Sequence, residues 1–127
     1  MREIDFRGKT ETGEWVYGSL YTDAQNECYI IRSKDEDPSF EILWVDSDTV
    51  GQFTGAWDSN DHKIYEGDIL ANEYGDTVIA SWGYDELTWF AHAPDDDEDN
   101  DILLYSAIDF KGFKTIKGNI FDNGETR

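Results

Sequence analysis

A run of carboxylates at residues 95–101 comes closest, by residue type and spacing, to a site that could do chemistry. Six of its seven residues are Asp or Glu. Alternating oxygen ligands at Asp95, Asp97 and Asp99 are similar to the start of a calcium-binding loop, but that loop also needs glycine at its sixth position and glutamate at its twelfth, and both are absent. Because like charges repel, we expect residues 94–101 to form an acidic, mobile loop, with no metal site.

Glu66 and Asp68 form the second arrangement with chemical potential, because residues two apart on a strand face the same side. Paired carboxylates can serve acid–base catalysis, although a glycosidase-type pair needs a defined separation across a cleft. In Tyr65-Glu66-Gly67-Asp68 the glycine also favours a bulge or turn. A metal-dependent hydrolase is therefore the least favoured function, and we expect no catalytic residues.

Nucleophile and metal-ligand patterns give no further candidate. Cys28 is the single cysteine, so we expect no disulfide or thiolate zinc cluster, and a structural thiol is the expected role. A catalytic thiol needs a base, and nothing in the sequence links Cys28 to His62 or His92. Gly-rich phosphate loops and serine elbows are also absent from the sequence. We expect no cofactor.

The charge of the chain restricts its partners. The formal net charge is -19 at pH 7, and the pI is about 4.1. Between residues 64 and 110 there are 13 acids and no Lys or Arg. This negative charge disfavours direct binding of nucleic acid and repels anionic membranes. The sequence also has no apolar run near the ~20 residues that a membrane-spanning helix needs. A start of Met1-Arg2-Glu3-Ile4-Asp5 is unlike a signal peptide, so we expect a cytoplasmic protein.

A strongly acidic surface attracts basic proteins. We call the predicted partner-binding residues the acidic patch; they are Asp85, Glu86, Asp95, Asp96, Asp97, Glu98, Asp99 and Asp101. Mimicry of nucleic acid toward a basic protein is the first functional hypothesis, and the alternative is that the acids only increase solubility. The second hypothesis is an oligomeric binder of nucleotide-like ligands, with Arg2, Arg7, Lys9 and Arg32 available for a phosphate.

Composition predicts a folded domain with one core. Leu, Ile, Val and Phe number 28, or 22% of the chain, which narrowly exceeds the level typical of disorder. Aromatic residues supply further apolar area. We expect them to be mainly core, with a minority at an interface or pocket, and the main candidates are Trp15, Tyr17, Trp44, Trp57, Trp82 and Trp89.

The elements that must position these groups are strands. Short segments rich in β-branched and aromatic residues recur between turns, without sustained helical periodicity, so the sequence predicts an all-β fold, or a mainly β fold with short helical turns. The two glycines of residues 50–55 favour a bend, and residues 102–108 are ambiguous between strand and helical turn. The predicted strands are 14–21, 28–32, 40–45, 63–70, 77–82, 87–92 and 113–121, with hairpins joining 28–32 to 40–45 and 77–82 to 87–92.

Five blocks in this order resemble the YopX family of small phage and prophage proteins. They are Arg2-Glu3-Ile4-Asp5-Phe6-Arg7-Gly8-Lys9, Gly13-Glu14-Trp15-Val16-Tyr17-Gly18-Ser19-Leu20, Val50-Gly51-Gln52-Phe53-Thr54-Gly55, Lys63-Ile64-Tyr65-Glu66-Gly67-Asp68-Ile69 and Lys117-Gly118-Asn119-Ile120-Phe121. We call the following the motif residues: Arg7, Trp15, Tyr17, Gln52, Tyr65, Glu66, Gly67, Asp68 and Asn119.

The resemblance implies a single β-rich domain over residues 1–127, with a small barrel-like, SH3-like antiparallel sheet and additional strands. It also implies a phage or prophage origin and assembly into a homo-oligomer, and it brings no established catalytic residues. The sequence departs from the family pattern at Asp61, where a turn glycine is expected, and in the acidic tract after Pro94.

Overall fold

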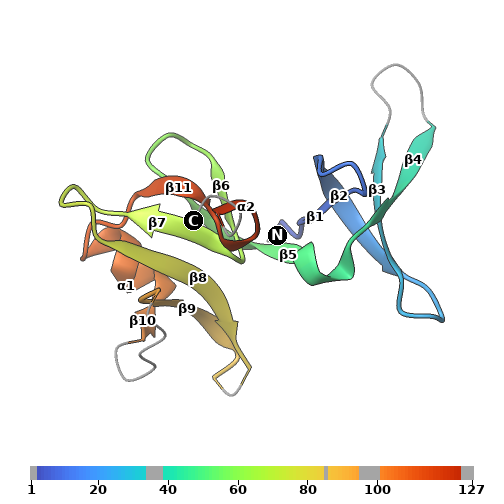
Figure 1. Ribbon diagram of the computed structural model, residues 1–127. Helices are drawn as coiled ribbons and strands as arrows, with labels where there is room; N and C mark the ends of the chain where they lie inside the picture. The colour runs from blue at the N-terminus through green and yellow to red at the C-terminus, as the bar shows by residue number, and fades with distance from the viewer. Residues whose placement is uncertain (1–2, 34–38, 85, 95–100, 124–127) are drawn as a thin grey trace. The chain divides into compact units, whose positions relative to one another are not determined.

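Two antiparallel sheets carry most of the regular structure in the computed structural model (Figure 1). The structure describes residues 3–33, 39–84, 86–94 and 101–123. The chain divides into two compact units, Met1–Phe53 (unit 1) and Thr54–Arg127 (unit 2).

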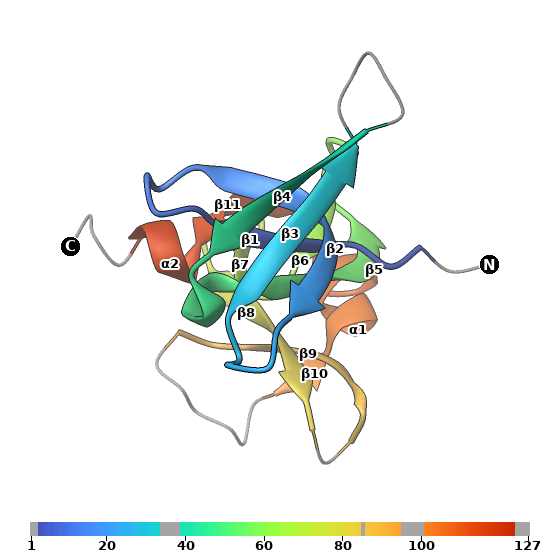
Figure 2. The same cartoon turned by 90° about the vertical axis from the view of Figure 1, so that its right-hand side faces the viewer.

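Unit 1 is a meander of antiparallel strands followed by a short 3-10 turn. The strands pair in the order β4-β3-β2-β1-β5, and Figure 2 shows β3 between β2 and β4. The core of this unit is small: among its described residues, the core cluster consists of Val16, Ile30 and Val45. Cys28 is half-buried against this cluster, which fits a structural thiol. The elements are β1 (Phe6–Lys9), β2 (Trp15–Thr22), β3 (Cys28–Ser33), β4 (Phe40–Val45), η1 (Ser47–Thr49) and the start of β5 (Gly51–Trp57).

Unit 2 contains a five-stranded sheet in the order β10-β9-β8-β7-β11 and two short helices. One side of the sheet packs against α1, because the buried helix residues Leu104, Ala107 and Ile108 share a core cluster with Leu70 of β7 and Val78 of β8. The elements that follow β5 are β6 (Lys63–Tyr65), β7 (Asp68–Ala71), β8 (Thr77–Gly83), β9 (Thr88–His92), β10 (Ile102–Leu103), α1 (Leu104–Asp109), β11 (Thr115–Asn119) and α2 (Ile120–Asn123).

The mainly β fold with short helical turns is confirmed, and both predicted hairpins are present as β3–β4 and β8–β9. The barrel-like, SH3-like form is not observed in the described residues, because both sheets are open at their edges. The prediction of one core is also wrong. Each unit buries its own cluster, since short strands with few large aliphatic side chains enclose only small cores.

Three local predictions differ from the structure. Residues 51–55 belong to β5 and Val50 precedes it, so the segment is mostly strand, with a local irregularity at Gly55, whose φ is 91°. Residues 63–70 are two strands separated by a turn at Glu66 and Gly67. The last predicted strand ends at Asn119 and continues as α2, while the ambiguous segment 102–108 divides into β10 and α1.

The aromatic residues are less buried than predicted. Val, Ile, Leu and Ala dominate both cores, and all six of the predicted core aromatics are exposed or half-buried. Trp82 and Trp89 pack edge to face with ring centroids 4.9 Å apart, and Trp89 contacts the unit 2 cluster. Indole rings are so large that they are seldom buried completely.

Among the helices of the described residues, none has the length and apolar character needed to cross a membrane.

Candidate functional site

Four of the motif residues lie together in unit 1. Arg7 of β1 pairs with Tyr17 of β2, and its neighbour Phe6 pairs with Gln52 of β5. The guanidinium carbon of Arg7 lies 4.6 Å from the centre of the Trp15 ring, and the Arg7 side chain is buried. A buried cation against an aromatic face stabilises the sheet, so these residues have a structural role in unit 1.

The other five motif residues come together in unit 2, where the turn between β6 and β7 meets the end of β11. The carbonyl of Gly67 accepts a hydrogen bond from the N–H of Ile120 at 2.9 Å, and Asp68 is paired with Asn119. Asp68 is buried, and its Oδ2 accepts a bond from the N–H of Tyr65 at 2.8 Å. Glu66 occupies the first position of this turn.

This turn overturns the expectation that Glu66 and Asp68 face the same side of one strand. The two residues do not belong to one extended strand, and the Asp68 carboxylate is used to hold the turn closed. Asn119 has a similar role, because its Oδ1 accepts hydrogen bonds from the N–H groups of Phe121 and Asp122 at the start of α2. The motif residues of unit 2 therefore hold the β6–β7 turn and the start of α2.

Asp58 is a structural residue that sequence reasoning missed. Its buried side chain accepts hydrogen bonds from the N–H groups of Asn60 and His62 at 2.9 Å and from Ile116 at 3.3 Å. Burial raises the pKa of this carboxyl, but the three N–H donors lower it by more than burial raises it. The pKa of Asp58 therefore lies below its usual value. The Asp-Ser-Asn turn pattern indicates the local bonds, whereas the bond to Ile116 leaves no signal in the sequence.

Two residues of the acidic patch lie among the residues that the structure describes. Glu86, after β8, and Asp101, before β10, are both exposed. Asp85 and residues 95–99 of the patch lie outside the described residues, as does most of the predicted acidic loop at 94–101. Three further exposed carboxylates of unit 2 belong to the same cation-free span of the chain, namely Glu73, Asp76 and Asp109.

The N-terminal cations do not form a phosphate site among the described residues. Arg7 and Lys9 both lie against Trp15, with the Lys9 Nζ 5.7 Å from the ring centre, and Arg32 pairs with Glu41 at 2.9 Å. Arg2 lies outside the described residues. In the described part of the chain there is also no group of three His, Cys, Asp or Glu side chains able to hold a metal ion.

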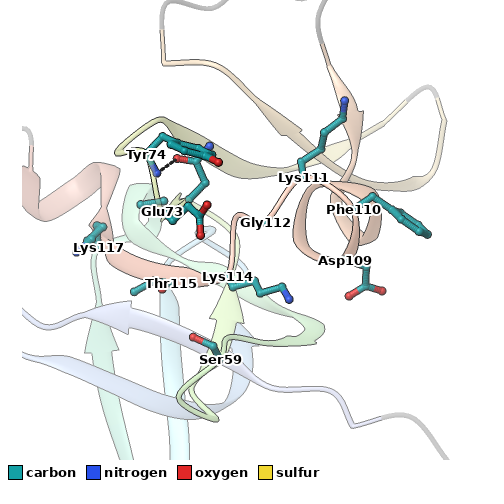
Figure 3. A pocket seen from close by; sticks show the side chains of 12 residues that line it. Ser59, Glu73, Tyr74, Asp109, Phe110, Lys111, Gly112, Lys114, Thr115 and Lys117 are labelled. Carbon is teal, nitrogen blue, oxygen red and sulfur yellow. Dashed lines mark hydrogen bonds between the residues drawn. The ribbon is translucent and has the colours of Figure 1, made fainter.

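Unit 2 has a pocket of about 750 Å³ between the β7–β8 turn and the segment that joins α1 to β11 (Figure 3). Lys111 and Lys114 line it on this segment, Lys117 lines it from β11, and Glu73 and Tyr74 line it on the turn. We call it the lysine pocket. Its volume lies in the range of about 300–1,000 Å³ that is common for small-molecule sites.

Hydrogen bonds to backbone groups hold both walls of the lysine pocket. On one wall, Oδ1 of Asn72 accepts hydrogen bonds from the N–H groups of Tyr74 and Asp76 at 3.0 and 2.9 Å. On the other, the N–H of Lys111 donates to the Ser106 carbonyl at 3.1 Å, and the carbonyl of Lys114 accepts from Ser59 at 2.8 Å. The backbone positions of the pocket are therefore fixed, while the exposed lysine side chains can turn.

Sequence reasoning did not identify the three lysines. Their spacing, at 111, 114 and 117, is a recognisable signal in a chain with ten Lys and Arg in all. The residues on the opposite wall are about 40 positions away, so only the pairing of β7 with β11 brings the two walls together.

The fold defines a mainly β protein built on two open antiparallel sheets, with four of the motif residues on strands of unit 1 and five at the β6–β7 turn and the end of β11 in unit 2. A family model described as YopX protein matches residues 5–126, and the chain belongs to this family. The crystal structure of protein EF1440 from Enterococcus faecalis has a similar fold, with a TM-score of 0.60, 22% sequence identity and 99% of each chain covered. No curated protein matches the chain.

Proposed function

We propose that this YopX-family protein acts without catalysis, by binding a basic partner protein through the acidic surface of unit 2. The observation that carries the proposal is the span from residue 64 to 110, which has 13 acids and no Lys or Arg. Five of these acids are exposed in the described residues. A surface of one sign accelerates encounter with a partner of the opposite sign.

A nucleic-acid-binding protein is the partner class with the best matching chemistry. Such proteins carry grooves lined by Lys and Arg that neutralise phosphates, and closely spaced carboxylates present the same sign of charge. We infer that the protein originates from a phage or prophage and works in the host cytoplasm, where it occupies such a groove and inhibits a host nucleic-acid-binding or defence protein. In this proposal, assembly into a homo-oligomer multiplies the acidic surface that each particle presents.

A salt-dependent pull-down from host lysate tests this function. Wild type is compared with a variant in which all eight residues of the acidic patch are replaced by Asn or Gln, at about 0.1 M and about 1 M salt, because the Debye length falls from about 10 to 3 Å between them. We expect wild type to retain a nucleic-acid-binding protein at low salt only, and nucleic acid to compete for it. Salt-independent retention, or equal retention by the neutralised variant, would contradict the proposal.

A matched pair of smaller variants separates the patch from net charge. Glu86→Gln with Asp101→Asn removes two exposed carboxylates of unit 2, and Glu11→Gln with Glu14→Gln removes two exposed carboxylates of unit 1. The first pair should weaken binding of the retained protein, and the second should leave it nearly unchanged. Equal effects of both pairs would mean that the acids act through overall charge and solubility.

Binding of a nucleotide-like small ligand is the second candidate function. The predicted cations Arg7, Lys9 and Arg32 give it little support because each already contacts Trp15 or Glu41. The lysine pocket of unit 2 favours it instead. No observation supports a carboxylate-dependent hydrolase, because Glu66 lies in a turn and Asp68 in β7, so the two do not share one strand.

A further inference from the structure

We propose that the lysine pocket of unit 2 is a binding site for a small phosphate-bearing ligand of the nucleotide class. The ammonium groups of Lys111, Lys114 and Lys117 supply the charge for the phosphates, and the exposed ring of Tyr74 supplies a surface for the base. The site is distinct from the acidic patch, so the failure of one proposal does not decide the other.

The distribution of cations is the first argument. Four Lys or Arg residues are described in unit 2, and three of them line this one pocket. The fourth, Lys63, lies over the Trp57 ring at 5.8 Å. In a chain of net charge -19, three of the ten Lys and Arg residues are therefore grouped at one pocket, where their charge can attract an anion.

The partners of the cations are the second argument. In the described part of the chain, Arg32 has an ion pair, and Arg7, Lys9 and Lys63 each lie against a tryptophan ring. By contrast, no described carboxylate lies within 4.0 Å of the Nζ atoms of the three pocket lysines. Among the described residues, these three ammonium groups are therefore available to a ligand.

The chemistry of the lining gives the ligand class. Lysine is a common point-charge ligand for phosphate, and its long flexible stem lets the ammonium group move to a bound anion. Tyr74 is 81% exposed, and an aromatic ring at the edge of a pocket can stack on a nucleobase. Ser59 adds a hydroxyl group to the lining, and Asn72 adds an amide that already contacts Asp76 at 3.3 Å.

Two carboxylates reduce the positive charge of the pocket lining. Glu73 and Asp109 also line the pocket, and Figure 3 shows Glu73 between Lys117 and the turn that carries Lys111. Three lysines against two acids leave a formal charge of +1 on the lining. We therefore expect a ligand with several negative charges to bind at moderate affinity, and removal of Glu73's charge to strengthen binding.

Isothermal titration calorimetry of the full chain tests the site with ATP, AMP and inorganic pyrophosphate as probes. The triple variant Lys111→Gln, Lys114→Gln, Lys117→Gln should weaken ATP binding by about tenfold or more, and the matching triple Arg variant should retain it because the charge is kept. Lys63→Gln, which removes one positive charge elsewhere in unit 2, should leave the affinity unchanged, while Lys114→Gln alone should lower it. Glu73→Gln should raise it.

The probes distinguish the sources of the phosphate. Tighter binding of ATP than of pyrophosphate, with a loss of that difference in Tyr74→Ala, would support a nucleotide ligand. Equal binding of ATP and pyrophosphate would overturn the nucleotide assignment. Absence of binding by wild type at millimolar ATP, or equal ATP affinity of wild type and the triple Gln variant, would overturn the site itself. Circular dichroism of each variant confirms folding, which should be preserved because Glu73, Tyr74 and the three pocket lysines are exposed and Lys63 is only half-buried.

Discussion

Oδ2 of Asp58 lies 3.3 Å from the backbone nitrogen of Ile116, so a carboxylate in the β5–β6 turn accepts a hydrogen bond from a strand 58 residues further along the chain. The other carboxylate oxygen closes the turn itself through Asn60 and His62. One buried side chain thus fixes a local reversal and joins it to β11. Because β11 leads into the lysine pocket, Asp58 supports the wall that carries Lys114 and Lys117.

Replacement of Asp58 by alanine should destabilise the protein by about 2–4 kcal/mol, because three backbone N–H groups lose their acceptor in a buried site. The midpoint of urea unfolding measures the loss. Asp61→Asn, at an exposed position of the same turn, is the control and should change the midpoint little. A similar midpoint for both variants would mean that the Asp58 hydrogen bonds contribute little net stability.

The contribution of Asp58 should depend on pH. Its pKa in the folded protein lies below the usual value of 3.8, because the effect of the N–H donors of His62, Asn60 and Ile116 exceeds that of burial, which raises it. A lowered folded pKa stabilises the native state fully above about pH 4 and loses this effect as the pH falls through the folded value. The stability difference between wild type and Asp58→Asn, from urea unfolding, should therefore shrink below pH 4. A difference that stays constant down to about pH 2 would contradict this assignment.

Gly67→Ala should be more harmful than Gly75→Ala. Both glycines have positive φ, 92° and 86°, so each substitution carries a backbone cost of about 1 kcal/mol. A Cβ on Gly67 would also lie 3.0 Å from the Phe121 ring, whereas one on Gly75 would have no heavy atom within 4 Å. Thermal unfolding of the two variants should show the lower midpoint for Gly67→Ala, and equal midpoints would mean that Phe121 moves aside at no cost.

Arg7→Ala should destabilise the protein more than Lys9→Ala, although both cations lie against Trp15. Arg7 is buried and 4.6 Å from the ring centre, whereas Lys9 is half-buried and 5.7 Å away. A desolvated cation–π contact is worth about 2 kcal/mol, and an exposed one about 0.5–1. Urea unfolding followed by circular dichroism checks the order. A larger loss of stability for Lys9→Ala would mean that Lys9 makes the more stabilising contact with the Trp15 ring.

The local pattern of the sequence predicts most of the strands, because alternation and β-branched residues are properties of short segments. The bounds of β4 agree with the prediction, and those of β3, β8 and β9 agree within one residue. Charge and membership of the YopX family also follow from sequence alone, since composition and motif order need no coordinates.

Only the tertiary structure decides how distant segments meet. The Tyr65-Glu66-Gly67-Asp68 block contains a turn that is held by distant residues, because Gly67 accepts a hydrogen bond from Ile120 and Asp68 pairs with Asn119. Contacts between such distant segments leave no periodic signal in the sequence. The grouping of Lys111, Lys114 and Lys117 opposite Tyr74 likewise depends on the pairing of β7 with β11. Local propensity determines which residues form strands, whereas the register between strands determines which side chains share a site.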